Sequence, residues 1–199
     1  MFPGLGLAIN DMWRVKQIDY SRLRAMSDNY ISFSDLTRNA LEATLVHHAV
    51  SFQKSDLDDI MSSYSRGIAF TDVHPLLSEL SLPWSILTNG NRELIHPMLV
   101  HAGIHCDEDQ LLTSDQVTTF KVNPRMYQLA FAWAQRFDSA TKSDLIFVSS
   151  NQWDAIAATW FGFTTCWVNR TGQTPDVLGA RPHREIRDLS ELITEFDLI

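Results

Sequence analysis

The sequence predicts an α/β fold with parallel strands, and two observations carry this prediction. After Gly67, short apolar runs alternate with stretches of helical periodicity, which is the pattern of strand–helix–strand units. Several of these runs end in small polar residues just before a helix. The clearest is the apolar run 145–148, which ends at Ser149 and leads into a helix for which Ser150 and Asn151 are both candidate caps.

The chain before Gly67 has a different character and predicts helices alone. Apolar residues recur at mostly helical intervals in the segments 7–26, 33–50 and 55–64, with Ser34 or Asp35 as the expected cap of the second. The composition changes at Gly67. We therefore predict a helical subdomain over residues 1–66 and an α/β core over residues 67–199.

In the core, the expected strands lie at 84–87, 111–112, 145–148, 165–168 and around Ile186. The expected helices lie at 73–80, 92–102, from Pro124 through Trp133, from the Ser150–Asn151 caps to about 161, and at 189–196. Pro124 suits the first turn of its helix, because that position needs no backbone N–H. Gly162 is the expected end of the helix before it, since glycine tolerates the left-handed conformation of a C-terminal cap.

Composition and charge exclude several classes of protein. The 199 residues are 45% apolar and carry a net charge of −8, which argues against a nucleic-acid-binding surface. No apolar run approaches the roughly 20 residues that span a bilayer, and the first residues show no secretory signal. Cys106 and Cys166 are too few to indicate a disulfide framework, so the expected location is the cytoplasm.

Three predicted strand ends carry polar side chains that suit catalysis. They are Thr88-Asn89, the loop leading to Lys121, and the segment from Ser149 to Asp154. Strand ends in an open α/β sheet are where ligands bind, and a cation near carboxylates suits a reaction that disperses negative charge. Taken singly, each also has a structural explanation, as a turn residue, a solvated lysine or a helix-dipole partner.

No metal site is expected. His101, His105 and Cys106 have spacings near those of metal ligands, but they fall at a predicted helix end without a fourth ligand nearby. His47 and His48 are adjacent and so point to different sides of a helix.

Taken together, the motifs resemble the type II L-2-haloacid dehalogenases of the haloacid dehalogenase superfamily. The resemblance runs over essentially the whole chain, and the string Ser149-Ser150-Asn151-Gln152-Trp153-Asp154 is its most specific part. The other segments that carry it are 2–14, 85–90, 121–127, 161–163 and 167–172. The implied fold is a haloacid dehalogenase-like, Rossmann-like parallel sheet with an N-terminal helical cap subdomain.

The resemblance also implies roles for individual residues. In the family, an aspartate at the end of the first strand displaces halide from C2, and water hydrolyses the resulting ester without metal or cofactor. Lys121 would stabilise the nucleophile, Asp154 would orient Lys121 or activate water, and Ser149 and Asn151 would hold the polar network. The binding residues it implies are Thr88 for the substrate carboxylate, Arg14, Asn89 and Trp153 for the halide, and Ile18, Phe33 and Tyr127 for the pocket wall.

The chain departs from the family pattern at its start. The family opens with a strand ending in Asp-x-Tyr-Gly-Thr, and this sequence begins at Met1-Phe2-Pro3-Gly4, so the first core strand with the nucleophile is missing. Asp72 is a weak substitute, because no Gly-Thr follows it. We expect either a destabilised chain or direct pairing of the strands that end at Thr88 and Ser149.

The leading interpretation is a hydrolase resembling (S)-2-haloacid dehalogenase that acts on a small 2-haloacid but is inactive as the chain stands. A non-catalytic, truncated paralogue and, less favoured, a Mg²⁺-dependent phosphatase are the alternatives. The phosphatase needs clustered acids around its metal, whereas the fourth motif offers only Asp154. A homodimer is the assembly that this interpretation allows.

Overall fold

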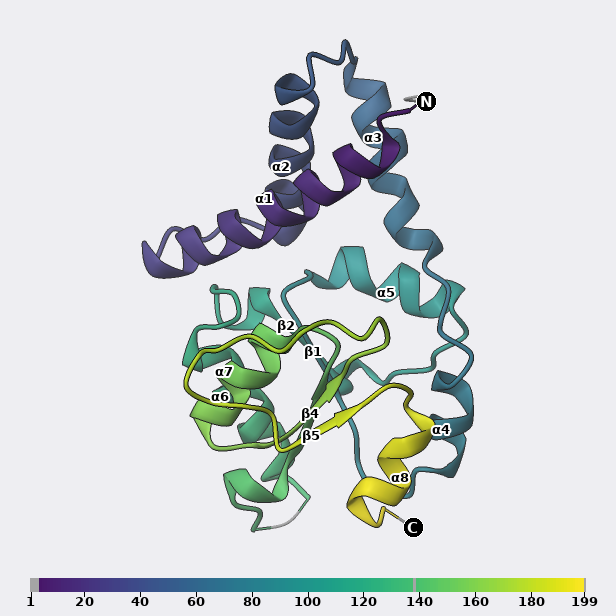
Figure 1. The fold of residues 1–199 in the computed structure, drawn as a ribbon, viewed down its shortest axis with the longest axis vertical. Coiled ribbons are helices and arrows are strands. Elements are labelled where there is room, and N and C mark those ends of the chain that lie inside the picture. The colour runs from purple at the N-terminus through teal and green to yellow at the C-terminus, as the bar shows by residue number, and fades with distance from the viewer. Residues whose placement is uncertain (1–3, 138, 199) are drawn as a thin grey trace. The chain divides into compact units, whose positions relative to one another are not determined.

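The computed structural model describes residues 4–137 and 139–198, which contain eight α-helices and five short strands (Figure 1). The elements are α1 (Gly6–Met26), α2 (Phe33–His47), α3 (Lys54–Ser62), α4 (Val73–Glu79), β1 (Ile86–Thr88), α5 (Arg92–His101), β2 (Leu111–Thr113), α6 (Pro124–Ala134), β3 (Ile146–Ser149), α7 (Gln152–Phe161), β4 (Thr164–Val168), β5 (Arg184–Ile186) and α8 (Ser190–Phe196). The predicted α/β class with parallel strands is confirmed. Phe2 and Pro3, part of the first family motif, lie outside the described residues.

The predicted elements match the observed ones closely, with two local corrections. Helix α2 is capped by Ser32, whose hydroxyl accepts from the Asp35 N–H at 3.1 Å, so the predicted cap at Ser34 or Asp35 is wrong. The helix also stops at His47, because Ala49 takes a left-handed conformation with φ of 52°. Gly162 ends α7 with φ of 107°, as predicted.

The described chain divides into two compact units, which we treat separately. The first unit comprises residues Met1–Ile68 and Leu87–Asn123, and the second comprises Ala69–Ile86 and Pro124–Ile199. Segment 87–123 thus groups with the N-terminal helices. The predicted subdomain boundary after residue 66 stays a prediction.

In the first unit, helix α1 packs against α2, and α3 completes a small helical core (Figure 1). The core consists of Ile9, Leu41, Leu45 and Leu57, all at most 5% exposed, with Trp13 packed against it. The Trp13 indole N–H donates to the Thr37 carbonyl at 2.8 Å, which pins α1 to α2. Strands β1 and β2 pair in a two-stranded sheet.

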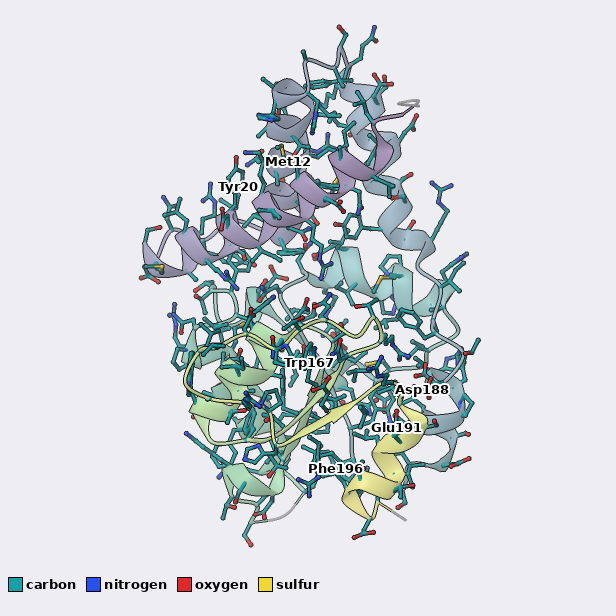
Figure 2. All side chains as sticks on the ribbon, in the orientation of Figure 1. Met12, Tyr20, Trp167, Asp188, Glu191 and Phe196 are labelled. Atoms are coloured by element: carbon teal, nitrogen blue, oxygen red, sulfur yellow. The ribbon has the colours of Figure 1, made fainter. Side chains whose placement is uncertain are left out.

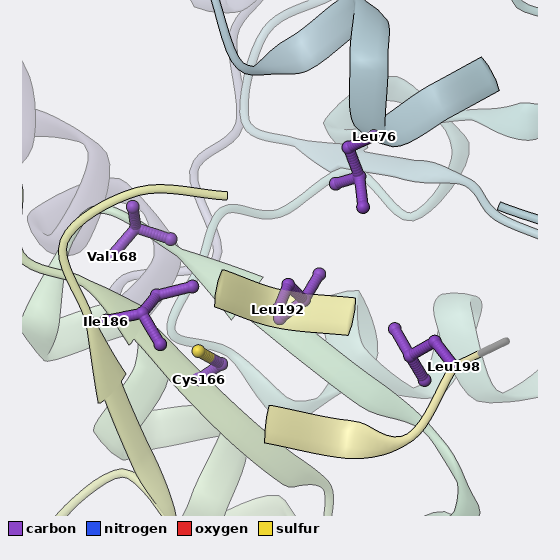
Figure 3. Packing of buried hydrophobic residues seen from close by; sticks show 6 residues of the cluster. All are labelled: Leu76, Cys166, Val168, Ile186, Leu192 and Leu198. Atoms are coloured by element: carbon purple, nitrogen blue, oxygen red, sulfur yellow. The ribbon is translucent and has the colours of Figure 1, made fainter. Parts of the chain in front are cut away.

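In the second unit, β3, β4 and β5 form a parallel sheet in that order. Alternation along β4 separates its two faces. Cys166 and Val168 pack with Leu192 of α8 and Leu76 of α4 in one apolar cluster (Figure 3). On the other face, the Trp167 indole N–H donates to the Ser150 carbonyl at 3.3 Å, just before α7.

Among the described strands, β1 and β3 belong to different sheets. The direct pairing expected between the strands ending at Thr88 and Ser149 is therefore wrong. In the described part of the chain, no helix is both long and apolar enough to cross a lipid bilayer.

Candidate active site

The first group of candidate residues lies in the first unit, where β1 turns into α5. The Thr88 hydroxyl oxygen accepts from the Gly90 N–H at 3.0 Å, so its own proton is still there to donate. A Cβ at Gly90 would come within 2.4 Å of Ile95, which explains why glycine occupies this turn. The result is a tight turn that presents the Thr88 hydroxyl and the Asn89 amide together.

Asn89 is fixed at both of its oxygens. Its side-chain Oδ1 accepts from the Lys121 N–H at 2.7 Å, and its carbonyl accepts from the Ser114 hydroxyl at 2.7 Å. The amide nitrogen of Asn89 carries two further N–H donors, the weakly polar kind of group that suits a halide or a carboxylate. The structure thus brings Thr88, Asn89 and the backbone N–H of Lys121 together.

Lys121 is a buried cation, because only 7% of its surface is exposed. Burial of an ammonium group is costly unless negative or polar partners surround it. A buried ammonium group is suited to attract a carboxylate. Its burial distinguishes Lys121 from an ordinary solvated lysine.

The remaining predicted residues of the first unit lie on its helices. Arg14 and Ile18 are one turn apart on α1 and so share one side of that helix. Phe33 begins α2, and its ring centroid lies 5.9 Å from that of Phe120, the residue just before Lys121.

The second group lies in the second unit, at the step from β3 to α7. Asp154 is 2% exposed, and its two carboxylate oxygens accept hydrogen bonds from different hydroxyl groups. Tyr127 donates to Oδ1 at 2.8 Å, and Ser149 donates to Oδ2 at 3.2 Å. The Ser149 oxygen in turn accepts from the Asn151 N–H at 3.2 Å. The structure therefore brings Ser149, Asn151, Asp154 and Tyr127 together.

Asn151 is the N-cap residue of α7, one of the two candidates that the sequence predicts. Trp153 follows in the first turn, and both side chains are half-buried. Asp154 also lies in this first turn, where the helix dipole favours a negative charge.

Tyr127, which the resemblance assigns to the pocket wall, is only 1% exposed. Its ring packs among Phe147, Phe161 and Phe163, with centroid distances of 5.7, 5.7 and 6.3 Å. Burial, together with the charge of Asp154 and their hydrogen bond, raises the pKa of Tyr127. The phenol therefore stays protonated at neutral pH and acts as a fixed donor to Asp154.

Asp72, the weak substitute for the nucleophile, has a structural role in the second unit. It lies just before α4, and its Oδ2 forms an ion pair with Arg170 at 2.7 Å and accepts from the Leu189 N–H at 2.7 Å. A carboxylate oxygen held by a guanidinium and an amide is a poor nucleophile. This arrangement ties α4 to the segment that begins α8.

The sequence does not predict two contacts of the site. Ser114 donates a hydrogen bond to the Asn89 carbonyl, and Tyr127 donates one to Asp154. In each pair the two residues are far apart along the chain. No local pattern marks Ser114, which follows a short strand as many serines do.

The chain resembles known hydrolases over nearly its whole length. A family model for haloacid dehalogenase-like hydrolases matches residues 3–162. The (S)-2-haloacid dehalogenase of Pseudomonas sp. (strain YL) is 35% identical over 199 residues, which cover 98% of this chain and 84% of that protein. The (S)-2-haloacid dehalogenase H-109 of Pseudomonas putida is 36% identical over 194 residues, which cover 96% and 85%.

Solved structures agree with this relationship. The L-2-haloacid dehalogenase RSc1362 superposes with a TM-score of 0.90 at 34% identity, covering 98% of this chain and 88% of that one. The L-2-haloacid dehalogenase from Xanthobacter autotrophicus with chloropropionic acid covalently bound superposes with a TM-score of 0.87 at 28% identity, covering 98% and 89%. Since the matched segment includes both polar turns described above, and the similarity extends over almost every residue, the chain belongs to the haloacid dehalogenase-like hydrolases.

Proposed function

We propose that this protein binds short (S)-2-haloalkanoic acids, the substrate class in its relatives' names, as a hydrolase that needs the family's nucleophile for turnover. The observation that carries the proposal is the buried Lys121, whose backbone N–H is bound by the Asn89 amide in the same turn as Thr88. A buried lysine whose backbone is hydrogen-bonded to a turn that carries a hydroxyl and an amide suits a small acid that loses an anion.

In the proposed reaction, a carboxylate oxygen forms a bond to C2 while the carbon–halogen bond breaks and the halide leaves. Water then attacks the carbonyl carbon of the ester, which releases the 2-hydroxy acid and regenerates the carboxylate. In the family this nucleophile ends the first strand, and we assign that role to none of the described residues.

The residues of the first unit have the following proposed roles. Lys121 stabilises negative charge, Thr88 donates to the substrate carboxylate, and the Asn89 amide and Arg14 receive the halide. Ile18 and Phe33 supply apolar surface that keeps water from the carbon–halogen bond.

In the second unit, Asp154 is the proposed acid–base or orienting carboxylate. Ser149 and Asn151 hold it through hydrogen bonds at the start of α7, and Trp153 is assigned to the halide. For Tyr127 the geometry supports positioning of Asp154 better than contact with substrate, because its ring is enclosed by phenylalanines.

The proposal is tested by calorimetric titration of the 199-residue chain with (S)-2-chloropropionate, its (R)-enantiomer and propionate. We expect preferential binding of the (S)-enantiomer and a loss of at least about tenfold in affinity for Lys121→Ala, because a buried charge partner is removed. Lys54→Ala, which removes an exposed lysine at the start of α3, is the matched control and should bind normally. Equal affinity for the three acids, or unchanged binding by Lys121→Ala, contradicts the proposal.

The same preparation separates the alternative functions. Hydrolysis of p-nitrophenyl phosphate that depends on added Mg²⁺ would favour the phosphatase. Binding of the (S)-acid without turnover, both by this chain and by a variant that carries the family's Asp-x-Tyr-Gly-Thr strand at its start, would favour a non-catalytic relative.

Location and assembly are further parts of the proposal. The two free cysteines, Cys106 and Cys166, support a reducing compartment such as the cytoplasm. We propose a homodimer, which light scattering coupled to gel filtration would test at about twice the chain mass of 22.7 kDa.

A further inference from the structure

The loop between α1 and α2 makes a specific polar contact with the end of β2 in the first unit. The Tyr30 hydroxyl donates to Asp115 Oδ1 at 2.6 Å and lies 3.0 Å from the Ser114 hydroxyl oxygen. The Tyr30 ring packs on Phe120, with centroids 5.0 Å apart. Phe120 directly precedes Lys121, so ring and hydroxyl both contact the segment that carries the buried cation.

Hydrogen bonds continue from this contact into the substrate-binding turn. The Ser114 hydroxyl donates to the Asn89 carbonyl at 2.7 Å, and the Asn89 side chain accepts from the Lys121 N–H at 2.7 Å. Ser114 is fully buried. A continuous path of three contacts therefore runs from the Tyr30 hydroxyl to the backbone of Lys121.

The two hydroxyl groups of this path supply two protons for three contacts. Tyr30 donates to Asp115 at 2.6 Å, and Ser114 donates to the Asn89 carbonyl at 2.7 Å. The 3.0 Å contact between the Tyr30 and Ser114 oxygens joins these two hydrogen bonds, and either hydroxyl can be its donor. Burial and the neighbouring Asp115 raise the pKa of Tyr30, which keeps its phenolic proton in place at neutral pH.

A second contact joins the same helices to the same turn. The Ser34 N–H and hydroxyl both donate to Asn91 Oδ1, at 3.0 and 2.7 Å. Asn91 is the N-cap residue of α5 and only 5% exposed. The helical segment is thus hydrogen-bonded directly to Asn91 and linked to Asn89 through Ser114.

We propose that Tyr30, Ser114 and Asp115 are positioning residues for Asn89 and Lys121. The turn that carries Asn89 takes its binding geometry only when Tyr30 of the α1–α2 loop contacts Ser114 and Asp115. The dependence of the Asn89 and Lys121 geometry on Tyr30 is argued from the hydrogen bonds above. The consequence for haloacid binding rests on the proposed function.

The test combines nuclear magnetic resonance with binding on the full chain. Tyr30→Phe removes the hydroxyl and keeps the ring on Phe120. We expect the Lys121 amide resonance to shift and its hydrogen exchange to rise about threefold to tenfold, the range that one ordinary hydrogen bond spans. The affinity for (S)-2-chloropropionate should fall by a similar factor.

The matched control is Tyr20→Phe, which removes a hydroxyl from a half-buried tyrosine of α1 outside this path (Figure 2). It should change neither the Lys121 amide nor the affinity. Thermal unfolding of each variant shows whether the chain remains folded.

A double-mutant cycle sharpens the result. Because Tyr30 acts through Ser114, Tyr30→Phe should add little in a Ser114→Ala background to the change at the Lys121 amide. If Ser114→Ala does not fold, the comparison of the Lys121 amide in Tyr30→Phe, Tyr20→Phe and the unaltered chain decides whether Tyr30 is a positioning residue.

An unchanged Lys121 amide in folded Tyr30→Phe overturns the inference, whatever the affinity does. Additive effects in the cycle also overturn it. If the unaltered chain binds no (S)-2-chloropropionate, the proposed function fails, and the amide measurements still decide the positioning role.

Discussion

At the scale of single residues, the best-defined feature is the carboxylate of Asp154. It is almost fully buried, yet two hydroxyl donors and the first turn of α7 stabilise its charge. Buried charges persist in proteins only with such partners. Tyr127 is the stronger of the two donors by distance, and its ring cannot move away because three phenylalanines enclose it.

Replacement of Tyr127 by Phe should therefore weaken the fold and the site together. We expect the free energy of unfolding to fall by about 1–3 kcal/mol, because a hydrogen bond to a buried charge is lost while the ring packing stays. Urea unfolding followed by circular dichroism measures this. An unfolding free energy equal to that of the unaltered chain would show that Ser149 alone satisfies Asp154.

Tyr127 also predicts how stability depends on pH. Its pKa is raised in the folded chain, so the unfolded chain loses the phenolic proton first as pH rises. Below the unfolded-state pKa of about 10, the contribution of Tyr127 to the free energy of unfolding should not change with pH. Above that pH, the free energy of unfolding should fall by at most about 1.4 kcal/mol per pH unit.

The check is the slope of unfolding free energy against pH in the alkaline range. In Tyr127→Phe the slope should be shallower, because this contribution is absent. Equal slopes in the two chains would mean that the tyrosine titrates alike in both states.

At the scale of elements, the candidate residues depend on how the helices begin and end. Helix α7 starts at the polar end of β3 and stops at Gly162, where the N–H groups of Gly162 and Phe163 bond to the last helical carbonyls. Because α7 ends there, the chain can enter β4, which pairs in parallel with β3 so that Ile146 lies opposite Thr164. Asp72, just before α4, accepts a hydrogen bond from the Leu189 N–H, just before α8, and so links the starts of these two helices.

Gly162→Ala tests the helix end. Gly162 has φ of 107°, which alanine adopts only with strain, so we expect a loss of about 1–2 kcal/mol in unfolding free energy. Gly6→Ala is the matched control: Gly6 begins α1, and an added Cβ meets nothing within 4 Å. It should be neutral or slightly stabilising, since alanine favours helix. The prediction fails if the two variants unfold alike.

At the scale of the whole molecule, the described strands form two sheets: β1 pairs with β2, and β3 pairs with β4, which pairs with β5. In the second unit, both carboxylate oxygens of Asp154 and Oδ2 of Asp72 accept from donors, whereas the buried Oδ1 of Asp72 has no hydrogen-bond partner among the described residues. A carboxylate oxygen that already accepts from a donor attacks carbon poorly, and the Arg170 ion pair stabilises the charge of the whole Asp72 carboxylate.

We therefore expect the 199-residue chain to release no chloride from (S)-2-chloropropionate. An ion-selective electrode or a colorimetric halide assay measures this. A variant extended at its start by an apolar strand ending in Asp-x-Tyr-Gly-Thr should release chloride, because it supplies the nucleophile that the family uses. Turnover by the unextended chain that Asp72→Asn abolishes would instead assign the nucleophile to Asp72.

Much of the fold could be predicted from the sequence because its signals are local. Periodicity located the helices, Pro124 and Gly162 marked helix limits, and polar residues after apolar runs marked Thr88, Asn89 and Ser149 as strand ends. The cap of α2 was misplaced, since several adjacent polar residues can each accept from the first helical N–H groups and only backbone geometry selects Ser32.

The sequence by itself determined the class of fold, the order of its elements, the family and the residues that mark the strand ends. The tertiary structure alone decided which distant side chains meet: Tyr127 with Asp154, Ser114 with Asn89, and Tyr30 with Asp115. The physical reason is that helix and turn preferences act between residues a few positions apart, whereas these hydrogen bonds join residues 25 to 85 positions apart that only packing brings into contact.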